Sequence, residues 1–183
     1  MSGGIPVEVP TSIENDFKIT PEQLEAAITP ATKMVWYSSP CNPSGSVYSR
    51  EELTALAAVL EKHPSIYVVA DEIYEHINFT GTYCSIASIP GMLDRTITVN
   101  GVAKAFAMTG WRLGVAIGPK EVIEKMGLVV QTIVSCVPPF IQKAGIEAIK
   151  GDQSAITGML AEYQQRRDVL IAGLNGIAGI KCV

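Results

Sequence analysis

The stretch ITVNGVAKAFAMTGWRLGVAIG, residues 97–118, places two cations in apolar surroundings. A β-rich apolar run ends at Asn100 and the glycine after it, Lys104 follows among Val, Ala and Phe residues, and Arg112 comes eight positions later. Lysine is rarely buried without a partner, because removing water from an ammonium group is costly. Either both charged heads extend into solvent, or the fold supplies a partner for each of them.

Around this stretch, short β-type runs alternate with amphipathic helical segments, a pattern typical of α/β folds. Capping boxes that begin at Thr20 and Ser49 predict two helix starts. Runs rich in Val, Ile and Tyr between turn residues predict strands. We expect strands at 34–38, 66–70, 96–99 and 113–117, and helices near 21–28, 50–63, 119–130, 139–151 and 153–174.

The last of these helices carries further expectations. Asp152 is predicted to cap it, and its polar block 164–168 to form a solvated face. Residues 175–183 resemble the start of a new strand. The side chains predicted to point inward are Ile156, Leu160, Tyr163, Val169 and Leu170.

The bulk composition favours a large apolar interface and argues against nucleic-acid binding. Of the 183 residues, 48% are hydrophobic and 17% are charged, against ~25% charged in an average protein. The mean hydropathy is +0.26. The net charge of −4 and the pI near 5.2 do not suit a polyanion-binding surface.

The cysteine spacing predicts neither a metal site nor a disulfide framework. Cys41, Cys84, Cys136 and Cys182 lie far apart, without a C-x-x-C pair. Reduced thiols in a cytoplasmic protein are the simplest interpretation. We see no signal-peptide pattern at the N-terminus and no uncharged apolar run of the ~18 residues that a membrane span requires.

Polar side chains follow three predicted strands at the point where each strand ends. Asn42 follows the first, Asp71 ends the second and Lys104 follows the third. If these strands are parallel, all three residues lie on one rim of the sheet, where α/β proteins bind ligands. Tyr74, one turn beyond Asp71, is expected in the same pocket.

This set of side chains suits pyridoxal phosphate. A lysine amine is a nucleophile toward an aldehyde, and a carboxylate favours the protonated form of a pyridine nitrogen. A phenol and an amide can bind a ring oxygen, and an arginine can hold a phosphate with two hydrogen bonds. Together these groups are the protein side of pyridoxal phosphate chemistry.

Three blocks carry a resemblance to the class I/II aminotransferases of the aspartate aminotransferase type: SSPCNPSGSVYSREEL (38–53), VVADEIYEHI (68–77) and VNGVAKAFAMTGWRLG (99–114). The resemblance implies a three-layer α/β/α sandwich with a mainly parallel sheet, truncated at both ends. In this interpretation residues 1–174 form part of the large, cofactor-binding domain, and residues 175–183 begin the small domain. The segments that bind the side chain and the carboxylate of the substrate would lie outside this chain.

The resemblance also implies site residues and partners. Lys104 corresponds to the catalytic, cofactor-bearing lysine, Asp71 to the carboxylate beside the pyridine nitrogen, and Arg112 to the phosphate-binding arginine. Tyr74 and Asn42 correspond to the pair that binds the phenolic oxygen of the ring. Amino-acid and 2-oxo acid substrates, a homodimer and a cytoplasmic location are implied as well, with no metal, nucleic acid or membrane partner.

The sequence departs from the family pattern at two positions near the lysine. Many relatives have a serine just before the lysine or three places before it, and its hydroxyl contacts the phosphate; here Ala103 and Gly101 occupy those positions. Structural roles also remain open, such as an ordinary turn at Asn42 and a surface ion pair at Arg112, and Glu72 is interpreted as structural. The functional alternatives to transamination are a lyase, decarboxylase or synthase of the same fold, or a fragment without turnover.

Overall fold

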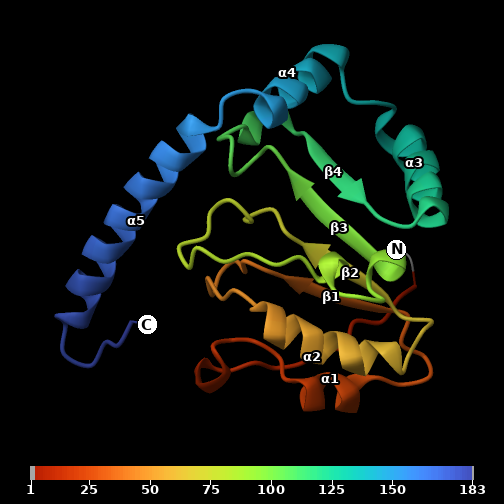
Figure 1. Ribbon diagram of the computed structural model, residues 1–183, viewed down its shortest axis with the longest axis horizontal. Coiled ribbons are helices and arrows are strands. Elements are labelled where there is room, and N and C mark those ends of the chain that lie inside the picture. Colours follow the sequence, from red (N-terminus) through yellow and green to blue (C-terminus); the bar gives the residue numbers. More distant parts are fainter. Residues whose placement is uncertain (1–2, 183) are drawn as a thin grey trace.

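The computed structural model describes residues 3–182, and a four-stranded sheet in the order β1-β2-β3-β4 lies at its centre (Figure 1). The strands β1, β2 and β3 are parallel, and β4 is antiparallel to β3. This confirms the predicted α/β class with a mainly parallel sheet. The strand bounds are Met34–Ser38, Tyr67–Asp71, Thr96–Gly101 and Gly114–Ile117, in that order.

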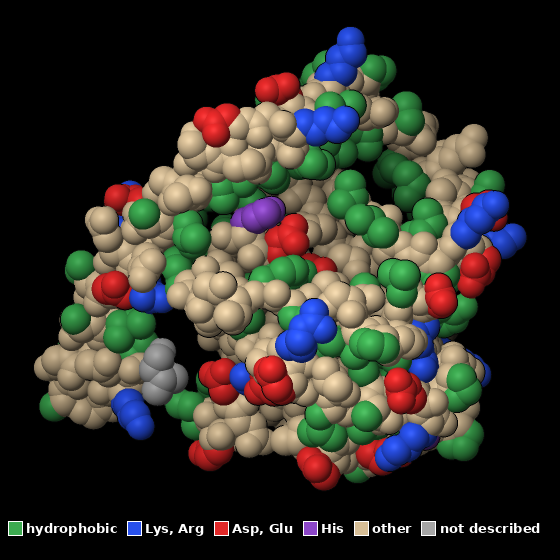
Figure 2. All heavy atoms as spheres, viewed as in Figure 1, with side chains coloured by type: hydrophobic (Ala, Val, Ile, Leu, Met, Phe, Trp, Pro, Cys, Tyr) green, Lys and Arg blue, Asp and Glu red, His purple; other side chains and the backbone are tan. Residues whose placement is uncertain are grey.

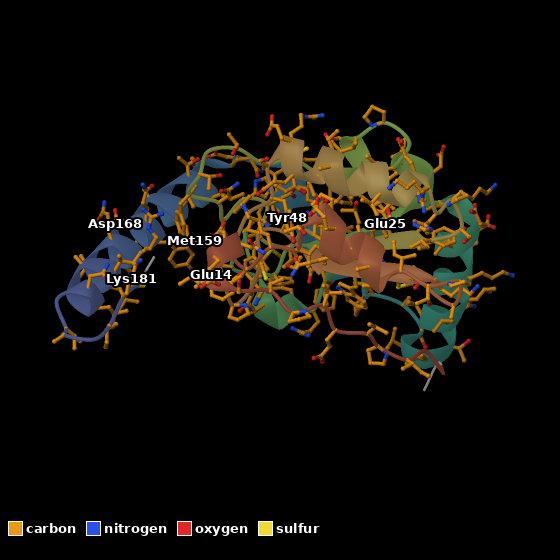
Figure 3. The ribbon with its side chains drawn as sticks, turned by 90° about the horizontal axis from the view of Figure 1, so that it is seen from below. Glu14, Glu25, Tyr48, Met159, Asp168 and Lys181 are labelled. Carbon is orange, nitrogen blue, oxygen red and sulfur yellow. The ribbon has the colours of Figure 1, made fainter. Side chains whose placement is uncertain are left out.

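Two helices, α1 (Pro21–Ala27) and α2 (Arg50–Glu61), lie on one side of the sheet (Figure 3). Thr20 Oγ1 accepts a hydrogen bond from Gln23 N, and Ser49 Oγ accepts one from Glu52 N. In both cases the glutamine or glutamate side chain bonds back to the N-cap amide, which completes the predicted capping boxes. Both predicted helix starts are confirmed.

The hydrophobic core lies between α2 and the first two strands. Val68 and Ala70 of β2 belong to it, and successive strand residues point to opposite faces, so Val69 and Asp71 face the other side of the sheet. That side is uncovered at β1, where Trp36 is 71% exposed. The largest fully buried side chains are those of Leu53, Leu60, Ile86, Met92, Val68, Thr96 and Ser39.

The helices α3 (Lys120–Val134) and α4 (Pro139–Lys150) border β4 (Figure 1). The helix α3 is about one turn longer than predicted, because Gln131 continues the helix and the first proline after it is Pro138. Short 3₁₀ segments lie in the connections: η1 (Ile13–Asn15), η2 (Ile86–Ser88), η3 (Leu93–Arg95) and η4 (Thr109–Trp111).

The long helix α5 (Ser154–Asn175) extends away from the sheet, and several expectations about it are wrong (Figure 1). Its N-cap is Gln153, although Asp152 Oδ1 accepts a hydrogen bond from Ser154 N at 3.0 Å. Of the predicted inward side chains only Ile156 is buried, and Val169 is 75% exposed. Leu160 is half-buried, and Tyr163 and Leu170 are exposed. Beyond Leu160, these apolar positions are left uncovered by the part of the chain that the structure describes.

Residues 176–182 form turns and irregular backbone, so the strand expected over 175–183 is not formed within its described part. A strand needs a neighbour that pairs with its backbone groups, and α5 places this segment away from the sheet (Figure 1). Within residues 3–182, no helix combines the length and apolar character that a bilayer crossing requires.

Candidate active site

The loops after β1, β2 and β3 begin side by side at one rim of the sheet. Ser39 N donates to Asp71 O at 3.1 Å, and Glu72 N donates to Val99 O at 2.9 Å. These bonds continue the parallel ladders just beyond the strand ends. The predicted meeting of the three strand ends at one rim is therefore present.

Asn42 lies in a tight turn after β1. Gly45 N donates to Cys41 O at 2.8 Å, and Gly45 has a φ of 76°, which glycine adopts without strain. The Asn42 side chain is exposed, and its Nδ2 donates to Tyr74 Oη at 3.3 Å. Residues 32 positions apart in sequence are thus joined at the rim.

Tyr74 also contacts Lys104. The Lys104 ammonium lies 5.7 Å from the centroid of the Tyr74 ring, within the range of a cation–π interaction. Both side chains are half-buried, and both lie in turns, at 73–76 and 103–106, rather than on the helix starts that strand–helix connections suggest. One of the two cations in apolar surroundings, Lys104, therefore has an aromatic partner.

Asp71 is the last residue of β2 and is half-buried. Its Oδ1 accepts a hydrogen bond from Ile73 N at 3.2 Å, which orients the carboxylate across its own turn. The strand alternation places it on the side of the sheet away from α2, the side that Val69 also faces.

Arg112 is not joined to the other four predicted residues by a hydrogen bond or ion pair within residues 3–182. Its side chain is exposed, its backbone has a φ of 53°, and its Nη1 donates to Thr109 O at 3.1 Å. The following residue, Leu113, lies against Gly145 of α4, where a Cβ atom would clash. The side chain just after Arg112 therefore packs on α4, while the guanidinium remains accessible.

Two further carboxylates lie beside the predicted residues; sequence reasoning interpreted Glu72 as structural and missed Glu75. Glu72 is buried next to Asp71. Glu75 Oε1 accepts a hydrogen bond from Asn100 Nδ2 at 2.7 Å. Asn100 is followed by a glycine, and this dipeptide is typical of a turn at the end of a strand. No local pattern indicates its hydrogen-bond partner 25 residues away.

The donor set at this rim fits pyridoxal phosphate. An amine, a phenol and an amide are connected by the Lys104–Tyr74 and Tyr74–Asn42 contacts, and the carboxylate of Asp71 ends the adjacent strand. The amine can react with the aldehyde of the cofactor, and the carboxylate can bind its ring nitrogen. The phenol and the amide can bind its ring oxygen. Ala103 and Gly101, on the N-terminal side of the lysine, offer no hydroxyl to a phosphate.

Comparison with known proteins gives one consistent family. The profile of the family "Aminotransferase class I and II" matches residues 1–183. An aspartate/prephenate aminotransferase of Cereibacter sphaeroides is 45% identical over the whole chain, and an aspartate aminotransferase of Rhizobium meliloti is 42% identical over 98% of it. The chain spans 46% and 44% of the lengths of these two relatives.

Solved structures agree with this result. The aspartate aminotransferase of Rhizobium meliloti matches with a TM-score of 0.92 at 42% identity, over 94% of this chain and 44% of that one. An aromatic aminotransferase of Pyrococcus horikoshii matches with a TM-score of 0.92 at 40% identity, over 96% of this chain and 48% of that one.

Proposed function

The chain belongs to the class I and II aminotransferase family, and from this premise we propose that the whole protein transfers the amino group of an amino acid to a 2-oxo acid. Aspartate is the first amino donor to test, because relatives at 42–45% identity are named for it. The observation that carries the proposal is the contact chain from Asn42 through Tyr74 to Lys104 at the carboxyl rim of the sheet.

Lys104 is the proposed catalytic residue. The family's cofactor, pyridoxal 5′-phosphate, supplies an electron sink when it is bound, which makes the substrate's α-proton removable. Lys104 would hold the cofactor through its amine, and that amine, when free, would accept the proton from the α-carbon of the substrate as a general base. The Tyr74 ring, 5.7 Å from the ammonium, favours an orientation of the amine toward this rim.

Three further residues have proposed holding roles. Asp71 would keep a proton on the pyridine nitrogen, because a nearby negative charge favours the cationic form. Tyr74 Oη, which accepts from Asn42 Nδ2, would donate its own hydrogen to the ring oxygen of the cofactor. Arg112 would bind the phosphate with its accessible guanidinium.

The proposal extends to the setting of the whole protein. Residues 1–174 would belong to the large domain and 175–183 to the start of the small one, because α5 leads away from the sheet. A homodimer is supported by the exposed apolar side chains of α3. A cytoplasmic location is supported by the free state of Cys41, Cys84, Cys136 and Cys182.

A titration of the 183-residue chain with pyridoxal phosphate tests the cofactor site. We expect a saturable visible absorbance band, which Lys104→Ala abolishes. Borohydride reduction followed by peptide mapping should locate the adduct on Lys104. The matched control is Lys120→Ala, whose ammonium is exposed on α3, and it should bind as the wild type does. Labelling spread over surface lysines, with the same band in both variants, would reject the site assignment.

The reaction itself is tested by product analysis. The protein restored to the full length of its relatives should convert aspartate and a 2-oxo acid into a new 2-oxo acid and a new amino acid. Asp71→Asn should lower kcat by roughly a hundredfold or more, the scale seen when one preorganised electrostatic contact is removed from an active site. Release of CO₂ without amino transfer would instead indicate a decarboxylase.

A further inference from the structure

Tyr74 and Lys104 lie on separate turns, and a partly buried hydrogen bond connects the Tyr74 turn to the end of β3, just before the Lys104 turn. Asn100 Nδ2, at the end of β3, donates to Glu75 Oε1 at 2.7 Å. Glu75 is the residue after Tyr74, and Asn100 lies four positions before Lys104. The bond therefore joins the turn that carries Tyr74 to the strand that leads into the turn of Lys104.

Asn100 is constrained at both ends of its amide. Its Oδ1 accepts from Gly101 N at 2.7 Å, while its Nδ2 donates to Glu75. The Glu75 side chain is only 29% exposed. A short hydrogen bond to a carboxylate is about twice as strong as a neutral one, and partial burial limits competition from water. Neither side chain can move without losing a bond.

A second contact crosses between the same two turns. The His76 ring packs edge-to-face on the Phe106 ring, with centroids 6.1 Å apart. His76 Nε2 also lies 3.5 Å from Glu75 Oε1, the oxygen that Asn100 binds. Since Phe106 is two residues beyond Lys104, the Tyr74 and Lys104 turns are held together on both sides of the lysine.

We propose that Glu75 and Asn100 are positioning residues, whose hydrogen bond sets where the Lys104 amine lies relative to the Tyr74 ring. Neither residue contacts the reacting groups. Their effect on pyridoxal phosphate binding rests on the proposed function, but their effect on the Lys104 turn does not. The two consequences are therefore measured separately.

The first readout is the accessibility of Lys104 without cofactor. The chain is labelled with a trace of an amine-reactive reagent, and mass spectrometry gives the labelling ratio of Lys104 to Lys120. Lys120 is an internal reference, with a side chain that is 88% exposed. We expect Glu75→Ala and Asn100→Ala to raise this ratio, and Glu75→Gln, which retains an acceptor oxygen, to restore it.

The second readout is the dissociation constant for pyridoxal phosphate. Each alanine variant should weaken binding about tenfold, the scale of one hydrogen bond to a charged group. The double variant should also be about tenfold weaker rather than a hundredfold, because residues that act through one shared bond are not additive. Glu162→Ala, which removes an exposed carboxylate paired with Arg166 on α5, is the matched control and should change neither readout.

The outcomes are separable. A raised labelling ratio that Glu75→Gln restores supports the positioning role, even where wild-type chain binds no pyridoxal phosphate and the proposed function fails. An unchanged ratio in both alanine variants overturns the positioning role, whatever the titration gives. Circular dichroism of each variant identifies global unfolding, and the Glu75→Gln variant keeps the test decisive if an alanine variant does not fold.

Discussion

Glu72 and Asp71 are adjacent carboxyl residues in very different surroundings. The strand alternation places Asp71 on the side of the sheet away from α2, whereas Glu72 follows β2 and lies near Ser85 and Tyr83. Glu72 is 3% exposed, and its Oε1 has no hydrogen-bond partner in the part of the chain that the structure describes. Burial raises the pKa of Glu72, although the hydroxyls of Ser85 and Tyr83 act in the opposite direction. Asp71 thus faces the rim of the sheet, whereas the carboxyl group of Glu72 is shielded from water.

This difference predicts a pH-dependent stability effect. A carboxyl group with a raised folded-state pKa stabilises the fold below its unfolded pKa of about 4.3 and loses that contribution as the pH rises through the folded value. Glu72→Gln should therefore increase the free energy of unfolding at pH 8 by about 1 kcal/mol, near the lower limit for an unsatisfied buried group. At pH 4 it should give no gain.

Urea unfolding of both proteins at pH 4, 6 and 8 measures this effect. Glu162→Gln, on an exposed position of α5, controls for loss of net charge and should follow the wild-type profile. Parallel profiles for the wild type and Glu72→Gln would show that Glu72 does not titrate differently in the folded protein.

At the scale of elements, Arg95 connects the end of α2 to the start of β2. Its Nη1 donates to Leu60 O at 2.7 Å and its Nε to Ile66 O at 2.9 Å. Its Nη2 donates to the carbonyls of His63 and Ile66. The guanidinium thus satisfies carbonyls at a helix C-terminus, where a cation is favourable. Burial lowers the pKa of Arg95, but an arginine keeps its charge in proteins.

Arg95→Met should destabilise the fold by about 3 kcal/mol, because it leaves buried carbonyls without donors. The midpoint of chemical denaturation measures the loss. Arg166→Met removes an arginine from an exposed ion pair on α5 and should change the free energy of unfolding by less than about 1 kcal/mol. Equal effects of the two substitutions would contradict the proposed connecting role.

At the scale of the whole molecule, the sheet and α2 form a packed body, whereas α3, α4 and α5 expose apolar side chains. Figure 2 shows hydrophobic side chains gathered along α3 and α4 where these helices face β4. Ile133 of α3 is 74% exposed. Exposed apolar surface of this kind is typical of an interface, and the chain spans less than half of the curated relatives it matches.

We expect the 183-residue chain to self-associate through α3. Ile133→Glu should shift sedimentation toward the monomer, because it places a charge in a desolvated contact. Val169→Glu places the same charge at an equally exposed apolar position of α5 and should not shift it. A monomer at all concentrations in the wild type, or identical shifts in both variants, would reject α3 as the contact.

Local signals in the sequence determined the helices and strands whose starts or ends are marked by capping or turn residues. The capping boxes at Thr20 and Ser49 located two helices, and the strand bounds 34–38 were predicted to the residue. Asn42, Asp71 and Lys104 each come at or just after the end of a predicted strand. With the single assumption that these strands are parallel, this was enough to predict that the three residues share one rim of the sheet. These signals depend on neighbours within a few residues, which the sequence displays directly.

Only the tertiary structure decided which of these residues touch and what lies behind them. The bonds of Glu75 to Asn100, and of Arg95 to the carbonyls of Leu60 and Ile66, join residues 25 or more positions apart. The inward face predicted for α5 failed for the same reason, since a helical period shows which side chains share a face but not whether anything packs on it. The sequence pattern by itself determined the helices, the strands and the rim of the sheet that holds the candidate site. Long-range packing decided the contacts, because a contact depends on two residues that are far apart in the sequence.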